Sequence, residues 1–457
     1  MHRVWAVARN TISQGIRMRV AAVVIVLLLV LLPLMGLTAV GDRTLLGRLQ
    51  TFVSYGLSLT SLLLCLLTVF VAVYTVTHDI KRHHIFLVVC KPIRRYEIVL
   101  GKLLGVVALN AMLLAAFGAI IYGLAWVMFY TANAPPPQAR QARQEFFTSR
   151  VRLDTKIDMD HLQAQILQEY NRLKFEGRIP EGMTRQRALG ILRSEALNIA
   201  KSVPPGYAKE WTFQNVRVSD PNTPLFVRYK LRALPSPVDD QVFSQWRVGD
   251  FRTRDAAGRL TGAAVPRYVA RRDPLRTFVE LSVPSSAVAD DGYVAVAYFN
   301  DPSRNACTVI PEEVQLLYRS GTFTGNFLRA LLMIFSRLVF LAAVGVCVST
   351  WLSFPVAILI CMAAFVTGTI NGFIVESLDL LEGPLSLLYT FTIKPLLWLL
   401  PKFDGDYNPT RFIVEGRAIG WGFLGQVYLT TGLIKAGLLV LLGVLIFHQR
   451  ELAKTAV

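Results

Sequence analysis

Long runs of apolar residues constrain this chain more than any other feature of its sequence. A transmembrane helix needs roughly 20 mostly apolar residues. Soluble globular proteins carry about 25% charged residues, whereas this chain has 17% charged and 53% hydrophobic residues. We therefore predict a polytopic α-helical membrane protein with about six transmembrane helices, at about Val20–Val40, Phe52–Val76, Leu103–Tyr130, Phe327–Trp351, Pro355–Val375 and Gly422–Phe447.

The apolar stretch Pro384–Pro401 is a separate case. It is shorter than the six spans, it contains Lys394–Pro395 in its middle, and proline stands at both of its ends. We interpret residues 384–401 as a re-entrant or interfacial hairpin on the external side of the membrane. A seventh full span is the alternative.

The net charge of +17 raises the question of nucleic-acid binding. Residues 132–324 carry 27 Lys and Arg against 21 Asp and Glu, a balance of +6. The apolar remainder carries 21 against 10, a balance of +11. A basic excess around apolar spans is typical of cytoplasmic loops. We expect contact with membrane lipid and no nucleic-acid partner.

The basic residues also set the predicted sidedness. The first span follows four cations and no anion, which places the N-terminus in the cytoplasm: Arg3, Arg9, Arg17 and Arg19. Residues 1–19 form an expected amphipathic elbow helix on the inner membrane face, because apolar residues recur every fourth position at Val4, Ala8, Ile12 and Ile16. Six spans place the C-terminus in the cytoplasm and residues 132–324 outside it.

Residues 132–324 have a different character from the spans, and a proline run, Pro135–Pro137, leads into them. Residues 138–202 show helical spacing with a break near Gly177–Gly182, and residues 210–320 alternate with the period of strands. We predict an inserted extracytoplasmic α+β domain that ends in a β-sandwich. The clearest strands are Phe226–Leu231, Phe278–Val283 and Tyr293–Phe299.

The ligand of this domain stays open at the level of sequence. Four aromatic residues either contact sugar or lipid or pack inside the sandwich: Trp211, Tyr229, Trp246 and Tyr298. The arginines between Arg247 and Arg276 either meet an anionic lipid or polysaccharide or form a solvated polar face. Cys307 is the one cysteine of the domain, so no intrachain disulfide framework is expected there.

The loop between the second and third spans, residues 77–102, carries the most specific pattern. A first helix should end before Lys91–Pro92, because proline disfavours the helical conformation of the residue before it. A second helix then becomes the third span. Gly101 and Gly105 form a small-xxx-small face that allows close approach of another helix, and Gly368 and Gly372 repeat this spacing.

This loop closely resembles that of the permease subunits of type-two ABC transporters, most of which are exporters. In that family an acidic residue and Ile open the loop, KP-V/I-x-R-x-E follows, and GK-x-x-G begins the next span. The ending Phe447–Leu452 resembles the family's F-x-x-R-E-L close, and the resemblance covers a little over half of the chain. The matching loop residues are Asp79, Ile80, Lys91, Pro92, Ile93, Arg95, Glu97, Gly101, Lys102 and Gly105.

The resemblance implies a coupling helix that sits in a groove of an ABC ATPase, with Arg94 among the coupling residues. It also implies a homodimer, or a dimer with a related permease, in the bacterial inner membrane. The large insertion after the third span departs from compact members and leaves the substrate open. A basic loop that only fixes topology is the alternative, but it does not account for Pro92, Glu97 and the glycine pair.

The chain has no phosphate loop of the form G-x-x-x-x-G-K-S/T, so ATP and Mg²⁺ are expected on a partner ATPase. We expect no cofactor, metal site or catalytic residue in this chain, which is not itself an enzyme. The cluster His78, His83, His84 and Cys90 fits no familiar zinc spacing.

Charged residues within spans are functional candidates by default. Lys435 and Arg337 are candidates for a translocation path. The alternative is that Lys435 snorkels or pairs with a buried acid such as Glu376.

The function predicted from these features is an ATP-driven export permease. A scaffold that organises envelope proteins, and a mechanotransmission protein that moves its external domain without passing substrate, are the alternatives.

Overall fold

The computed structural model describes residues 2–39, 41, 44–81, 94–155, 159–180, 183, 185–217, 223–252, 267–378 and 389–449. The chain divides into two compact units. The helical unit consists of Met1–Ser149 and Gly321–Val457, and the sheet unit consists of Arg150–Ser320.

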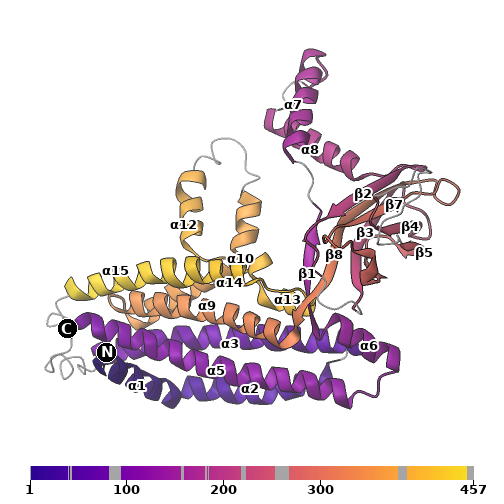
Figure 1. Ribbon diagram of the computed structural model, residues 1–457. Helices are drawn as coiled ribbons and strands as arrows, with labels where there is room; N and C mark the ends of the chain where they lie inside the picture. The colour runs from indigo at the N-terminus through magenta and orange to yellow at the C-terminus, as the bar shows by residue number, and fades with distance from the viewer. Residues whose placement is uncertain are drawn as a thin grey trace. The chain divides into compact units, whose positions relative to one another are not determined.

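Within the described residues, the helical unit (Figure 1) contains six helices that are long and apolar enough to cross a membrane, as predicted: Arg19–Thr38, Leu45–Lys81, Arg95–Thr131, Phe323–Ser349, Phe354–Val375 and Trp421–Gln449. Its full helices are α1 (His2–Arg17), α2 (Arg19–Thr38), α3 (Leu45–Lys81), α5 (Arg95–Thr131), α6 (Pro136–Glu145), α9 (Phe323–Ser349), α10 (Phe354–Leu378), α12 (Lys394–Leu399), α13 (Pro409–Val414), α14 (Trp421–Val427) and α15 (Ala436–Gln449). Two π-helical segments, Tyr389–Ile393 and Tyr428–Lys435, precede α12 and α15, and a 3₁₀ turn, Gly405–Tyr407, lies before α13.

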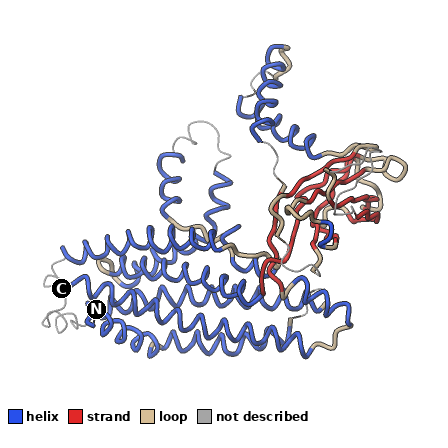
Figure 2. The backbone as a smooth tube through the Cα atoms, viewed as in Figure 1, coloured by secondary structure: helices blue, strands red, loops and turns tan. Residues whose placement is uncertain are grey.

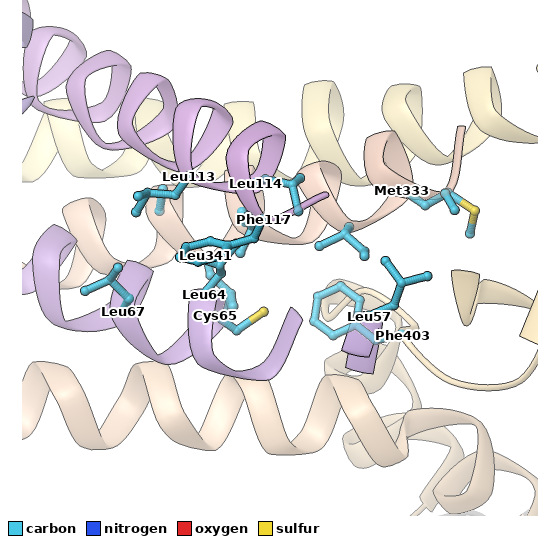
Figure 3. Packing of buried hydrophobic residues seen from close by; sticks show 14 of the residues in the cluster. Leu57, Leu64, Cys65, Leu67, Leu113, Leu114, Phe117, Met333, Leu341 and Phe403 are labelled. Carbon is cyan, nitrogen blue, oxygen red and sulfur yellow. The ribbon is translucent and has the colours of Figure 1, made fainter. Parts of the chain in front are cut away.

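Helices α3, α5 and α9 lie side by side in Figure 1 and contact one another, and α15 contacts α5 and α9. Figure 3 shows part of the hydrophobic core, where Leu64 and Cys65 of α3, Phe117 of α5 and Leu341 of α9 are drawn together and Phe403 is drawn beside Leu57 of α3. Burial within this core is uneven along the chain. Of the most apolar window of each helix, 72% is buried for α9 but only 17% for α10 and 22% for α14 to α15.

The segment interpreted as a re-entrant hairpin is described from Tyr389 onward, and residues 384–388 lie outside the described part. Helix α12 covers only Lys394–Leu399, far fewer residues than the roughly 20 that a membrane crossing needs. The six candidate spans found among the described residues do not include it.

The sheet unit contains two four-stranded sheets, drawn red in Figure 2, with strand orders β1-β8-β3-β6 and β2-β7-β4-β5. The strands are β1 (Thr148–Asp154), β2 (Ala208–Phe213), β3 (Leu225–Leu234), β4 (Gln241–Gly249), β5 (Arg267–Pro274), β6 (Phe278–Val283), β7 (Val294–Phe299) and β8 (Thr308–Thr322). One hydrophobic core takes residues from both sheets. β3 and β6 cover two of the segments predicted from period-two alternation, and β7 covers the third except for its first residue, Tyr293.

Aromatic side chains lie at the centre of that core. The ring of Tyr229 in β3 lies 4.1 Å from that of Trp246 in β4, and Tyr298 in β7 lies 4.9 Å from Trp246. All three side chains are fully buried, whereas Trp211 is partly buried against the same core. The interior alternative is therefore confirmed for these three residues, and a sugar- or lipid-contacting surface made by them is wrong.

Residues 138–202 are only partly helical. Helices α7 (Met159–Phe175) and α8 (Arg185–Lys201) flank the expected break, where Gly177 adopts a left-handed φ of 65°. Strand β1 replaces an expected helix, because this short segment pairs with β8 at the edge of a sheet. Helix α6 belongs to the helical unit, where Phe146 packs 5.1 Å from Phe323.

Candidate functional site

The predicted coupling loop lies between the end of α3 at Lys81 and the start of α5 at Arg95. Its two flanks are described, but Lys91 and Pro92 lie outside the described residues, as does most of the His/Cys cluster. The flanking residues show what anchors the loop to the helices.

An ion pair joins the two flanks. The Lys102 ammonium of α5 lies 2.5 Å from a carboxylate oxygen of Asp79 in α3, and it donates to the side-chain oxygen of Gln14 in α1 at 3.2 Å. The Lys102 side chain is 4% exposed and that of Asp79 15% exposed. Since an isolated buried charge is costly, each of the two groups requires the other. The pair therefore connects α1, α3 and α5.

The surroundings of this pair are apolar. A small cavity beside Asp79 and Lys102 is lined by Val76, Val346 and Phe447, among other residues. Ile80, one residue after Asp79, packs against the same hydrophobic core. Low polarity around the pair strengthens its mutual attraction and raises the penalty for separating it.

Arg95 connects the start of α5 to the end of α15. Its guanidinium donates to the backbone oxygen of Phe447 at 3.1 Å and to that of His448 at 2.8 Å. The last carbonyl groups of a helix lack partners within the helix, and a cation stabilises that end. Two segments that carry the family resemblance, the loop and the C-terminal ending, are thus in direct contact.

Glu97 organises the first turn of α5. Its carboxylate accepts a hydrogen bond of 2.8 Å from the backbone N–H of Arg94, as an acidic residue does in a capping box. The Arg94 side chain itself is exposed, and Tyr96 is 40% exposed. Arg94 and Tyr96 therefore offer the accessible surface at this end, while Arg95 and Glu97 bind within the chain.

Gly101 and Gly105 contact α1, the helix predicted to be an amphipathic elbow. A methyl group added at Gly101 would stand 2.6 Å from Cβ of Val7, and one at Gly105 would stand 2.6 Å from Cβ of Thr11 and 2.7 Å from the backbone oxygen of Ala8. Only glycine allows backbones to approach this closely. The small-xxx-small face thus packs α1 lengthwise along α5.

Gly368 and Gly372 face a returning loop. A methyl group at Gly372 would stand 2.6 Å from a carboxylate oxygen of Asp404, and one at Gly368 would stand 3.0 Å from the ring of Phe403. The Gly372 N–H donates to Asp404 at 2.6 Å, and the Phe403 N–H donates to the Gly368 oxygen at 2.9 Å. The glycines let this non-helical segment bind the backbone of α10.

The two candidate path residues, Arg337 and Lys435, bind the same region of the chain. Arg337 donates to the backbone oxygens of Phe403 and Tyr407 at 2.6 and 2.7 Å. Lys435 donates to the backbone oxygen of Leu400 at 2.9 Å. At a rise of about 1.5 Å per residue, Arg337 lies about 21 Å along α9 from its start. The irregular segment therefore reaches the middle of a candidate span.

Sequence reasoning missed two members of these networks, Gln14 and Asn371. The buried amide of Asn371 donates to the Leu397 oxygen at 3.0 Å and so fixes the end of α12. An amide within an apolar helix was an available signal, because such side chains hydrogen-bond between helices. Gln14 lies in a polar stretch of α1, and no local pattern marks it.

The chain was compared with protein-family models and with curated proteins. Neither comparison gave a match.

Proposed function

We propose that this chain is a membrane permease subunit of an ATP-driven export transporter, and that a separate ATPase docks on the loop between α3 and α5. The observation that carries the proposal is the anchoring of both loop flanks. The Asp79–Lys102 pair and the Arg95 contacts connect the flanks to α1, α3, α5 and α15. A force applied to the loop would therefore act on four helices together.

In this proposal, ATP and Mg²⁺ bind to the partner subunit, and closure of two ATPase subunits displaces the loop. The chain's own residues transmit that displacement. Arg94 supplies an exposed cation, Arg95 connects α5 to α15, and the glycine face keeps α1 against α5. The substrate would cross between two copies of the chain.

The weakly buried helices support a paired arrangement. Apolar side chains such as Leu359, Leu433 and Leu438 are more than half exposed on α10 and the last candidate span. In a membrane such surfaces face lipid or another apolar helix. We propose a homodimer, or a dimer with a related permease, in the bacterial inner membrane, with both termini and the loop on the cytoplasmic side.

A second candidate is a mechanotransmission or scaffold protein. The observation that favours it is the sheet unit, which has its own hydrophobic core and is a compact unit of the chain. Such a unit can serve as a cargo that the membrane part moves, or as a docking point for envelope proteins, without substrate passing through the spans.

Co-purification of the full chain with an ATPase, followed by ATP-turnover measurements, tests the docking site. We choose Arg94→Glu because the side chain is exposed, whereas changes at Arg95 or Glu97 would also break contacts within the chain. The matched control is Arg140→Glu, another exposed arginine, in α6. We expect Arg94→Glu to reduce ATPase retention at least tenfold and the control to leave it unchanged.

The docking proposal fails if no ATPase co-purifies, or if both variants retain it as the unmodified chain does. Flux into reconstituted vesicles then separates the two candidates. ATP-dependent accumulation of a solute in the vesicles supports the permease. ATP turnover that changes when the sheet unit is altered, without any accumulation of solute, supports mechanotransmission.

A further inference from the structure

A cavity in the sheet unit has the features of a ligand site and is independent of the proposed coupling loop. It has a volume of about 280 Å³, and its lining includes residues of the β3–β4 connection, of β5 and of the turn between β7 and β8. Small-molecule sites commonly begin near this size.

Two arginines converge at the cavity around one aromatic ring. Arg272 of β5 lies directly opposite Phe243 of β4 in the strand register, where side chains are near neighbours. The Arg304 guanidinium, from the turn after β7, lies 5.1 Å from the centre of the Phe243 ring. Both arginines are exposed; among the described residues neither forms a salt bridge within 4 Å, and the charge of Arg304 acts on Asp301.

The charge of the lining is therefore positive. Arg272 and Arg304 both contribute a guanidinium group to the lining, against one acidic residue, Asp239. The Asp239 carboxylate already accepts a hydrogen bond from the Gln241 N–H at 3.4 Å. An anion that enters the cavity meets two guanidinium groups suited to carboxylate or phosphate.

The remaining wall is uncharged. Val242 and Cys307 line the cavity with buried side chains, and burial raises the pKa of the Cys307 thiol, which keeps it neutral. The Asn305 amide is already bonded to the Phe243 backbone N–H and oxygen, at 3.0 and 2.7 Å. Its hydrogen-bonding atoms are thus occupied. Ser236 and Gln241 add polar groups to the lining, and the rest of the wall offers apolar contact to a ligand.

We propose that this cavity binds a small amphipathic anion. Arg272 and Arg304 hold its carboxylate or phosphate group, and its apolar body packs against Phe243, Val242 and Cys307. The charge fixes the orientation of the ligand, and the apolar wall sets its size and shape.

Titration of the full chain, in nanodiscs of zwitterionic lipid, tests the site by ligand-observed NMR. The probes are benzoate and phenyl phosphate, which share an apolar ring, and benzyl alcohol as the neutral counterpart. The variants are Arg272→Gln and Arg304→Gln. The matched control is Arg247→Gln, because Arg247 is exposed and stacks on Phe251 at 5.2 Å but does not line the cavity.

We expect saturable binding of at least one anion, weakened about tenfold or more by either cavity variant, as loss of a hydrogen bond to a charged group predicts. The control should bind within about twofold of the unmodified chain on the same basis, because it keeps both cavity arginines. Preference for benzoate identifies the head group as a carboxylate, and preference for phenyl phosphate identifies a phosphate.

Three results would overturn the proposal. The first is that neither anion binds, and the second is that benzyl alcohol binds as tightly as the anions. The third is that the cavity variants and the control behave alike while all unfold at the same temperature. A cavity variant that fails to fold is replaced by Arg→Lys at the same position, which keeps the cation and should retain binding of the preferred anion.

Discussion

Two polar networks lie among the apolar helices, and they use their cations differently. At the loop flanks, Lys102 faces a carboxylate, Asp79, that belongs to another helix. Halfway along α9, Arg337 faces two backbone oxygens of an irregular segment, and Lys435 faces a third. In the first network, an ion pair between side chains joins two helices. In the second, the cations donate hydrogen bonds to backbone carbonyl groups that have no partner in a helix or a sheet.

This difference indicates different roles. Non-helical backbone at the depth of a membrane is tolerated only where its polar groups find partners, so the second network is required wherever the segment at Phe403–Tyr407 enters the helices. The Asp79–Lys102 pair at the loop flanks joins two side chains and satisfies no irregular backbone. A charge pair between two helices next to a loop is better suited to transmit movement of that loop.

The largest expected effect comes from Lys102→Met. It leaves the partly buried Asp79 carboxylate without the Lys102 cation, with the His78 ring 4.0 Å away. Breaking one partner of a buried pair costs about 3–5 kcal/mol, and the 15% exposure of Asp79 places the loss at the lower end of that range. Unfolding of the full chain in detergent should show a loss of that size.

The double variant Asp79→Asn with Lys102→Met is the control for this prediction. It removes both charges and should recover most of the lost free energy of unfolding. A double variant no more stable than Lys102→Met alone would show that the pair itself is not what stabilises this end.

Arg337→Met should have the next largest effect. It removes two charge-assisted hydrogen bonds and leaves the Phe403 and Tyr407 oxygens without this donor. One hydrogen bond to a charged group contributes about 1.5–3 kcal/mol, and interhelical bonds in membranes contribute less, so we expect a total of about 2–3 kcal/mol.

The comparison variant for that measurement is Arg329→Met. Arg329 donates to a single carbonyl oxygen, that of Ile419, at 3.0 Å and lies nearer the start of α9. Arg329→Met should lower the free energy of unfolding by roughly half as much as Arg337→Met. If Arg329→Met and Arg337→Met lowered the free energy of unfolding equally, the middle of α9 would have no special requirement for a cation.

Gly105→Leu tests the packing of α1 on α5. The new side chain would overlap Thr11 and the backbone of Ala8, and forced overpacking costs about 1–3 kcal/mol. Gly123→Leu in the same helix is the control, because nothing lies within 4 Å of a methyl group added there. The first variant should expose α1 to protease, and the second should not; similar digestion of both would remove the glycine face from the packing argument.

The glycines also show which contacts could be predicted from the sequence. Helical spacing predicted a close approach at Gly105 and Gly372, and the structure has both. The partner differs in kind: Gly105 meets a helix, whereas Gly372 meets the side chain of Asp404 in a loop. Spacing within one helix identifies a surface that permits contact, but it contains no information about which distant segment fills it.

Local patterns predicted the elements that depend on local patterns. Apolar runs gave the six candidate spans, and alternation gave β3, β6 and β7. The contact between Arg95 and the end of α15 joins residues separated by most of the chain, so no window of sequence indicates it. Strand β1 was not predicted, because its extended conformation depends on pairing with β8, which is adjacent in the sheet but distant in the sequence.

Lys435→Met should have the smallest effect on stability. Lys435 is half-buried and makes one hydrogen bond, to the Leu400 oxygen, and such bonds in membranes average about 0.6 kcal/mol. The matched control is Lys402→Met, an exposed cation of the same segment, which should leave stability unchanged.

The small size of the effect of Lys435→Met makes Lys435 the sharpest test of the second network, because a loss of stability too small to unfold the chain can be separated from a loss of activity. If Lys435 only satisfies the carbonyl group, ATP-dependent flux in vesicles should fall little. If it lines a translocation path, Lys435→Met should reduce flux at least tenfold while the unfolding curve shifts hardly at all. Lys435→Arg keeps the cation and should restore the flux.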